Sequence, residues 1–163
     1  MTNKDFFLKL WAGEGKAFEN VFKAINEKKW HAHKPDPKSK TAKELAIYMV
    51  AELDHVAQLM KKGALDMGKH KPKPMKNLAE LVKLFKKDFA AAGRAVAKLT
   101  DKEWEKGVAA LSGPFGEWKD TKQNIAWGYL VDLIHHRGQL STYLRAMGGK
   151  VPSIYGPSAD SMQ

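Results

Sequence analysis

Four segments of this chain place large apolar residues three or four positions apart over many helical turns, and this repetition is the strongest constraint on its fold. The segments are residues 3–29, 41–62, 78–99 and 121–147. Such spacing gives a helix one apolar stripe, which must be buried against other helices. Strand-like alternation is hardly visible anywhere. The sequence therefore predicts an all-α protein, a four-helix bundle that forms a single domain over residues 1–163.

Local signals mark the ends of these helices. Two prolines between residues 30 and 37 close the connection after the first segment, because proline cannot continue a helix. Thr41 followed by Glu44 has the spacing of a capping box, which indicates the start of the second helix. Gly148 is placed to end the fourth helix.

Three shorter segments lie outside the four long helices. Thr100 and the residues after it are expected to cap a short extra helical turn. Residues 112–116 contain two glycines and a proline, and we expect them to be irregular. The C-terminal tail, residues 151–163, also holds two prolines and is expected to be irregular.

The absence of cysteine and the basic charge narrow the functional classes. Without cysteine there is no disulfide framework and no thiolate ligand, so we expect a cytoplasmic protein whose metal ligands are imidazole and carboxylate groups. We find no apolar run long enough to span a membrane and no signal-peptide core. The formal net charge of +10 comes mainly from lysine, and the densest patch, residues 61–76, has no aromatic residue on which bases could stack. We therefore expect no specific nucleic-acid partner.

The fourth segment carries the most informative polar residues. At about 100° per residue, His136 falls inside the apolar arc of this helix, and Asp132 lies one turn earlier at the edge of the arc. His135 is rotated by about 100° and is expected to face outward. Imidazole and carboxylate groups on adjacent turns can supply two ligands to one metal ion. A buried histidine hydrogen-bonded to an aspartate is the other interpretation, and spacing alone leaves both open.

The second segment offers three candidates for a third ligand. Tyr48, Glu52 and His55 fall within roughly 60° of one another on its helix, beside the apolar stripe. Any of them could complete a ligand set with open coordination positions. The alternative is an ordinary boundary strip, in which these side chains keep their polar ends in water.

Several motifs occur in the order found in a known family. The run IHHRGQL at 134–140, followed by YLR at 143–145 and VPSIYGP at 151–157, resembles the C-terminal signature of DinB/YfiT-like proteins. Residues 30–37 and 41–45 resemble the first connection and the second helix start of that family, so the resemblance spans nearly the whole chain. It implies an up-up-down-down type of four-helix bundle, often dimeric, with a divalent ion held by three side chains.

The resemblance also implies which residues hold the ion. Two ligands come from positions i and i+4 of the fourth helix, which match Asp132 and His136, and the third is normally a histidine on the second helix. That position holds Tyr48 here, which is a departure, because a neutral phenol with a pKa of about 10 is a poor ligand. Glu52, one turn further along, is a nearer substitute than His55, two turns along. The third ligand is thus open among these three, and zinc or nickel is the expected metal.

Relatives of this kind include transferases and isomerases that use low-molecular-weight thiols, whose pKa a Lewis-acidic ion lowers before they attack an electrophile. The resemblance therefore predicts a metal-dependent thiol S-transferase that acts on a small thiol and an electrophile. The alternative is a metal-free, stress-associated binding or scaffold bundle with a degenerate metal site. A homodimer is also expected, since the first segment has more large aromatic side chains than one stripe needs: Phe6, Phe7, Trp11, Phe18 and Phe22.

Overall fold

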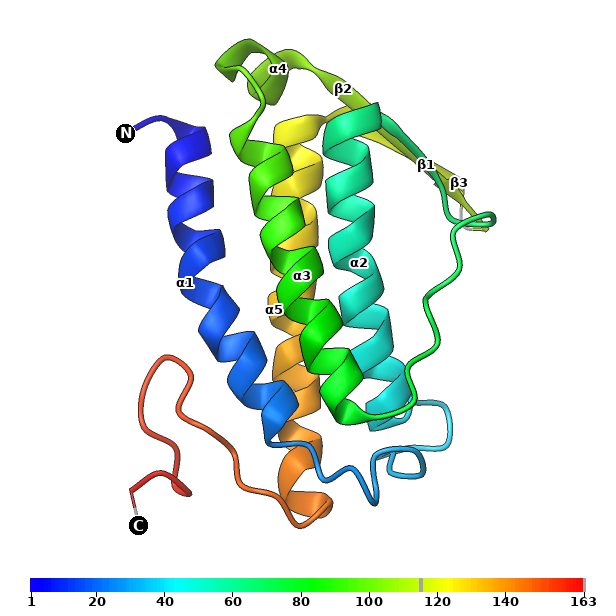
Figure 1. Ribbon diagram of the computed structural model, residues 1–163, viewed down its shortest axis with the longest axis vertical. Coiled ribbons are helices and arrows are strands. Elements are labelled where there is room, and N and C mark those ends of the chain that lie inside the picture. The colour runs from blue at the N-terminus through cyan, green and yellow to red at the C-terminus, as the bar shows by residue number, and fades with distance from the viewer. Residues whose placement is uncertain (115, 163) are drawn as a thin grey trace.

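The computed structural model describes residues 1–114 and 116–162. Four long helices stand side by side, as the sequence predicted (Figure 1): α1 (Asn3–Lys23), α2 (Ala42–Lys62), α3 (Leu78–Ala97) and α5 (Lys122–Ala146). The short helix α4 (Asp101–Lys106) covers one end of the bundle and confirms the extra helical turn. In Figure 1 the long helices run down, up, up and down in chain order. This order differs from the implied up-up-down-down type, because the connection between α2 and α3 crosses the length of the bundle.

Most helix ends follow the sequence signals. The threonines at positions 2, 41 and 100 each form a capping box with the acidic residue three positions later. Gly148, just beyond α5, has the left-handed backbone conformation expected at a helix end, with φ of 80°.

The first helix is shorter than predicted, because it ends at Lys23 and not near Lys29. Asn26 explains the difference. Its side chain accepts a hydrogen bond from the backbone of Lys28 and donates one, of 2.8 Å, to the carbonyl of Met147 at the end of α5. An asparagine that bonds nearby backbone in this way favours a turn over a continued helix.

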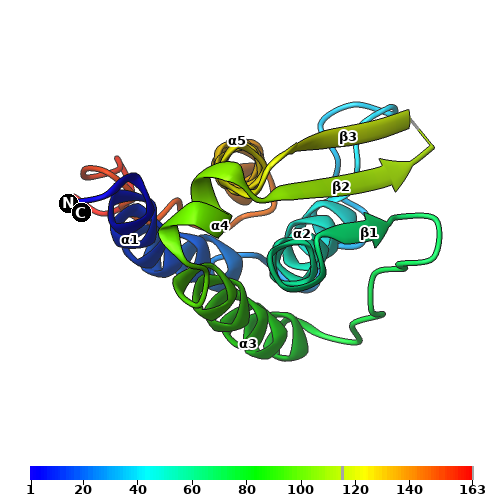
Figure 2. The same ribbon diagram turned by 90° about the horizontal axis from the view of Figure 1, so that it is seen from above.

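A three-stranded sheet, which the sequence analysis did not predict, projects from the side of the bundle formed by α2 and α5 (Figure 2). β1 (Ala64–Asp66) pairs in parallel with β2 (Val108–Gly113), and β2 pairs antiparallel with β3 (Gly116–Thr121). The expectation that residues 112–116 are irregular was wrong for Ser112, Gly113 and Gly116, which are paired in β2 and β3; Phe115 lies outside the described residues. The all-α prediction therefore holds only approximately, for a mainly helical fold with a small sheet.

Aromatic side chains fill the core between α1 and α3. Trp11 stacks on Phe89 with 4.6 Å between ring centroids, and its indole N–H donates to the carbonyl of the same residue. Of the five aromatic residues predicted to be in excess on α1, only Phe6 stays exposed, at 42%. Most of the apolar surface that suggested a dimer is thus buried within one chain, and the homodimer stays a prediction. Among the described residues, we find no helix with the length and apolar character needed to cross a membrane.

The C-terminal tail is irregular, as predicted for residues 151–162, and a buried ion pair fixes it to the bundle. Arg137 of α5 is 2% exposed and pairs with Glu14 of α1 and with the hydroxyl of Tyr155 in the tail. The Tyr155 hydroxyl also donates to Glu14 at 2.9 Å. The guanidinium lies over the ring of Phe18 at 4.8 Å. These contacts join the first helix, the last helix and the tail.

Candidate metal centre

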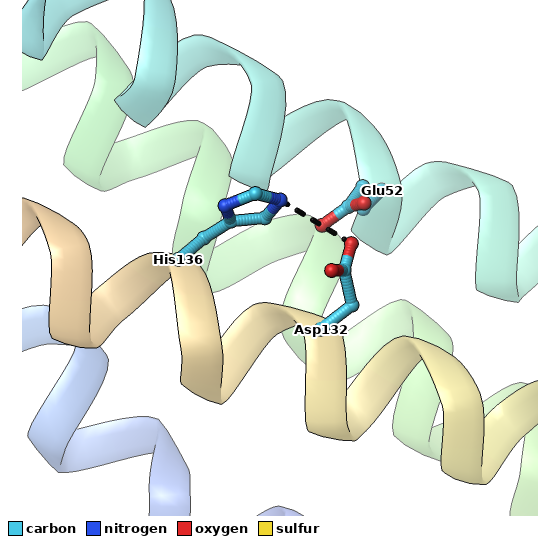
Figure 3. A group of neighbouring side chains, drawn as sticks. All are labelled: Glu52, Asp132 and His136. Atoms are coloured by element: carbon cyan, nitrogen blue, oxygen red, sulfur yellow. Dashed lines mark ion pairs between the residues drawn. The ribbon is translucent and has the colours of Figure 1, made fainter. Parts of the chain in front are cut away.

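Glu52 on α2 faces Asp132 and His136 on α5 (Figure 3). Each of the three side chains offers one ligand atom, and these atoms lie within 4.8 Å of one another. Asp132 and His136 are four residues apart, so they project from adjacent turns of one helix face. His136 Nε2 lies 3.3 Å from Asp132 Oδ2. Of the two third-ligand candidates that carry a carboxylate or an imidazole, Glu52 and His55, Glu52 is the one that the structure brings to this pair.

Tyr48 and His55 lie beside this group but do not belong to it. The ring of Tyr48 meets the ring of His136 edge to face at 5.2 Å, and burial raises the pKa of Tyr48, so its phenol stays neutral. His55 Nδ1 lies 3.4 Å from the hydroxyl of Tyr129. Burial lowers the pKa of His55 to about 4, so this ring is neutral at pH 7. His135 is exposed and contributes nothing to the group.

Glu52 is the buried carboxyl of the site. It is 2% exposed, and its Oε2 has no hydrogen-bond partner within the described residues. Burial, with the neighbouring carboxyl of Asp132, raises the pKa of Glu52 to about 9. Without a cation, Glu52 therefore keeps its proton at neutral pH. A divalent cation would supply the positive charge that two adjacent carboxylates need, and the unpartnered buried oxygen fits a metal ligand.

Gln139 orients the ring of His136. His136 Nδ1 lies 2.9 Å from Gln139 Oε1, and because an amide oxygen only accepts hydrogen bonds, Nδ1 carries the proton. The other ring nitrogen, Nε2, then faces Asp132 and can serve as a ligand when it carries no proton. Metal-binding histidines are commonly held by an outer partner in this way. Sequence reasoning missed this role, although a glutamine three residues after a histidine on a helix is a usable signal.

The three groups open into a pocket of about 430 Å³ between α2, α5 and the sheet. Lys40 lies at its rim, with Nζ 5.2 Å from the centroid of the Tyr48 ring. Towards the sheet and the start of α5, the pocket has a mainly apolar wall, made by Met67, Leu111, Trp118, Gly128 and Tyr129. The sequence analysis did not identify this wall, because it did not predict the strands that carry Leu111 and Trp118. The pocket gives a small molecule access to the three ligand candidates.

Comparison with known proteins supports the relationship predicted from the motifs. The model of the DinB family matches residues 1–163. This chain belongs to the DinB family. The crystal structure of a DinB-like protein from Bacillus subtilis matches it with a TM-score of 0.71 and 19% sequence identity, over 93% of this chain and 99% of that one. At this identity the likeness shows a shared fold. A search of curated proteins found no match.

The donor set of this DinB-family chain suits a divalent cation. Imidazole and carboxylate groups bind zinc and other first-row metal ions, and three protein ligands leave coordination positions open for a substrate. Glu52 stands one helical turn from Tyr48, the position at which the resemblance implies an imidazole ligand.

Proposed function

We propose that this DinB-family chain is a divalent-metal-dependent transferase that joins a low-molecular-weight thiol to an electrophile in the cytoplasm. Its ligands are Glu52, Asp132 and His136, and its metal is zinc or nickel. The observation that supports this most strongly is the approach of the three donor atoms to within 4.8 Å beside an open pocket. A bound cation would supply Lewis acidity, which lowers the pKa of a thiol towards neutral pH.

The transfer involves three changes of bonding, and Gln139 and Tyr48 are placed to assist it. The thiol proton leaves to water in the pocket, sulfur forms a bond to the electrophilic carbon, and the leaving group departs with its electron pair. Gln139 accepts a hydrogen bond from His136 Nδ1 and orients the ring, so that Nε2 can face the ion. Tyr48, whose pKa is raised by burial, keeps its hydroxyl proton and can donate a hydrogen bond to the departing group.

A metal-free binding or scaffold bundle is the second candidate, and one observation favours it. His136 Nε2 lies 3.3 Å from Asp132 Oδ2, so these two side chains can partner each other without a metal ion. With Glu52 protonated beside them, only one carboxylate of the site is charged, which lessens the electrostatic need for a cation.

Calorimetric titration with zinc and nickel separates the two candidates. The protein, purified without a histidine tag and stripped with a chelator, is expected to bind one ion per chain. His136→Ala should weaken binding at least a hundredfold, about 2.7 kcal/mol, whereas His135→Ala removes an exposed neighbouring imidazole and should change nothing. The loaded protein is then expected to consume cysteine in the presence of an alkylating electrophile. If the wild-type protein takes up neither metal, the transferase proposal fails and the scaffold stands.

A further inference from the structure

The sheet side of the pocket is apolar, and the proposed metal chemistry does not use it. Leu111 and Trp118 are directly paired between β2 and β3, so their side chains lie on one face of the sheet. Both line the pocket, and Met67, which follows β1, lies beside them. The lining residues Asp132 and Lys40 are charged. Asp132 is one of the ligand candidates, and Lys40 lies near the ring of Tyr48.

Gly128 on α5 makes room for Trp118. A Cβ at position 128 would lie 2.6 Å from Cη2 of the indole, so glycine is needed for the ring to lie against the helix backbone. A glycine inside a helix is less favourable than alanine by about 1 kcal/mol, which the contact with Trp118 offsets. Trp118 is nevertheless 38% exposed, and its ring centroid lies 6.1 Å from that of Tyr129 with 33° between the planes. A large aromatic side chain is thus held in place while part of its surface stays open.

We propose that this part of the pocket binds a planar aryl group of the electrophile, packed against Trp118 and Tyr129. That this aryl group belongs to the electrophile rests on the proposed function. Binding of an aryl group at this site does not require a metal ion. Aromatic rings pack favourably against other rings and against thioether sulfur, which Met67 supplies. Tyr129 lies three residues before Asp132, less than one turn of α5. An aryl group on Tyr129 therefore places its reactive substituent beside the ligand candidates.

Nuclear magnetic resonance of the indole N–H groups tests the proposal in chelator-treated protein. The chain has five tryptophans, and Trp118→Phe identifies the Trp118 signal by its loss. Titration with benzyl alcohol, a neutral and unreactive aryl probe, is expected to shift the Trp118 signal to saturation. The signal of Trp30, which is 3% exposed and does not line the pocket, should stay in place. A Trp118 signal that moves no more than that of Trp30 would overturn the proposal.

Substitutions in the wall give the second part of the test. Trp118→Ala and Gly128→Ala should each weaken benzyl alcohol binding at least fivefold, the second because its new methyl group displaces the indole. Val131→Ala, on the exposed face of the same helix, is the control and should leave binding unchanged. Trp118→Phe keeps a ring and should bind within threefold of the wild-type protein, which separates loss of the wall from loss of folding. If wild-type protein and Trp118→Ala bind benzyl alcohol equally well, the aryl site is refuted. It is also refuted if the wild-type protein binds cyclohexylmethanol as tightly as benzyl alcohol.

The two proposals fail separately. Aryl binding without metal uptake would reject the transferase and keep the aryl site. Metal uptake without aryl binding would keep the transferase proposal and reject the aryl site.

Discussion

Replacing Glu52 by glutamine tests the electrostatics of the site in the metal-free protein. The carboxyl ionises at about 4.5 when it is free in the unfolded chain, whereas burial and Asp132 raise its pKa to about 9 in the folded protein. Between these two values the folded state holds a proton that the unfolded state has lost. The free energy of unfolding therefore falls as the pH rises, by about 1.4 kcal/mol per pH unit. This contribution to stability is complete below about pH 4.5 and is lost progressively towards about pH 9.

Glutamine has nearly the same shape as protonated glutamate and cannot ionise. Its amide N–H can also donate to Asp132, as the protonated carboxyl does. Glu52→Gln should therefore lack the pH-dependent term, and its stability relative to the wild-type protein should increase by about 2.7 kcal/mol between pH 6 and pH 8. Contributions from the other titrating groups are shared by both proteins and cancel in this difference.

Urea unfolding of chelator-treated protein at pH 6, 7 and 8 measures the effect. A stability difference that stays constant over this range would refute the raised pKa of Glu52. Saturating zinc should then make the wild-type protein more stable than Glu52→Gln, because an ion that binds only the folded wild-type protein stabilises it by mass action. Equal stabilisation of both proteins by zinc would show that Glu52 is no ligand.

Three further predictions concern the ligand set, the tail and assembly. Tyr48→His places an imidazole beside the three donors and should tighten zinc binding at least tenfold, about 1.4 kcal/mol, in a calorimetric titration; a degenerate site would gain no affinity. Arg137→Ala leaves the carboxylate of Glu14 without its buried partner and should lower the free energy of unfolding by about 3–5 kcal/mol. Arg145→Ala breaks an exposed pair and should cost less than about 1 kcal/mol, and similar losses for the two arginines would contradict this reasoning. The predicted homodimer should appear by light scattering at micromolar concentration and weaken in Phe6→Glu, and a monomeric mass for the wild-type protein would count against it.

The helices could be predicted because an amphipathic stripe is a local property of the sequence. The sheet could not, since β1 has only three residues and lies within a lysine-rich connection. β3 is largely exposed and so lacks the apolar alternation that marks a half-buried strand. The pairing of β1 with β2 also joins segments far apart in the chain, which no local pattern reports.

Only the part of the site that lies on one helix could be predicted from the sequence. Asp132 and His136 lie on one helix, so helical phase alone puts them on one face. Tyr48, Glu52 and His55 share a face of α2 and differ mainly in height along its axis, by 1.5 Å per residue. Which of them meets the pair depends on how far α2 is shifted along α5, and packing and connections set that shift. The structure puts Glu52 at the level of the pair.

The close fit of Gly128 and Trp118 has a consequence for how this protein can evolve. The indole and a side chain at position 128 would occupy the same space, so a substitution at either position limits what the other can tolerate. Among DinB-family chains that share this hairpin, we expect alanine or a larger residue at the helix position to occur with a small residue at the strand position. The two positions should then covary in a sequence alignment, and the shape of the pocket should change in steps that involve both residues together.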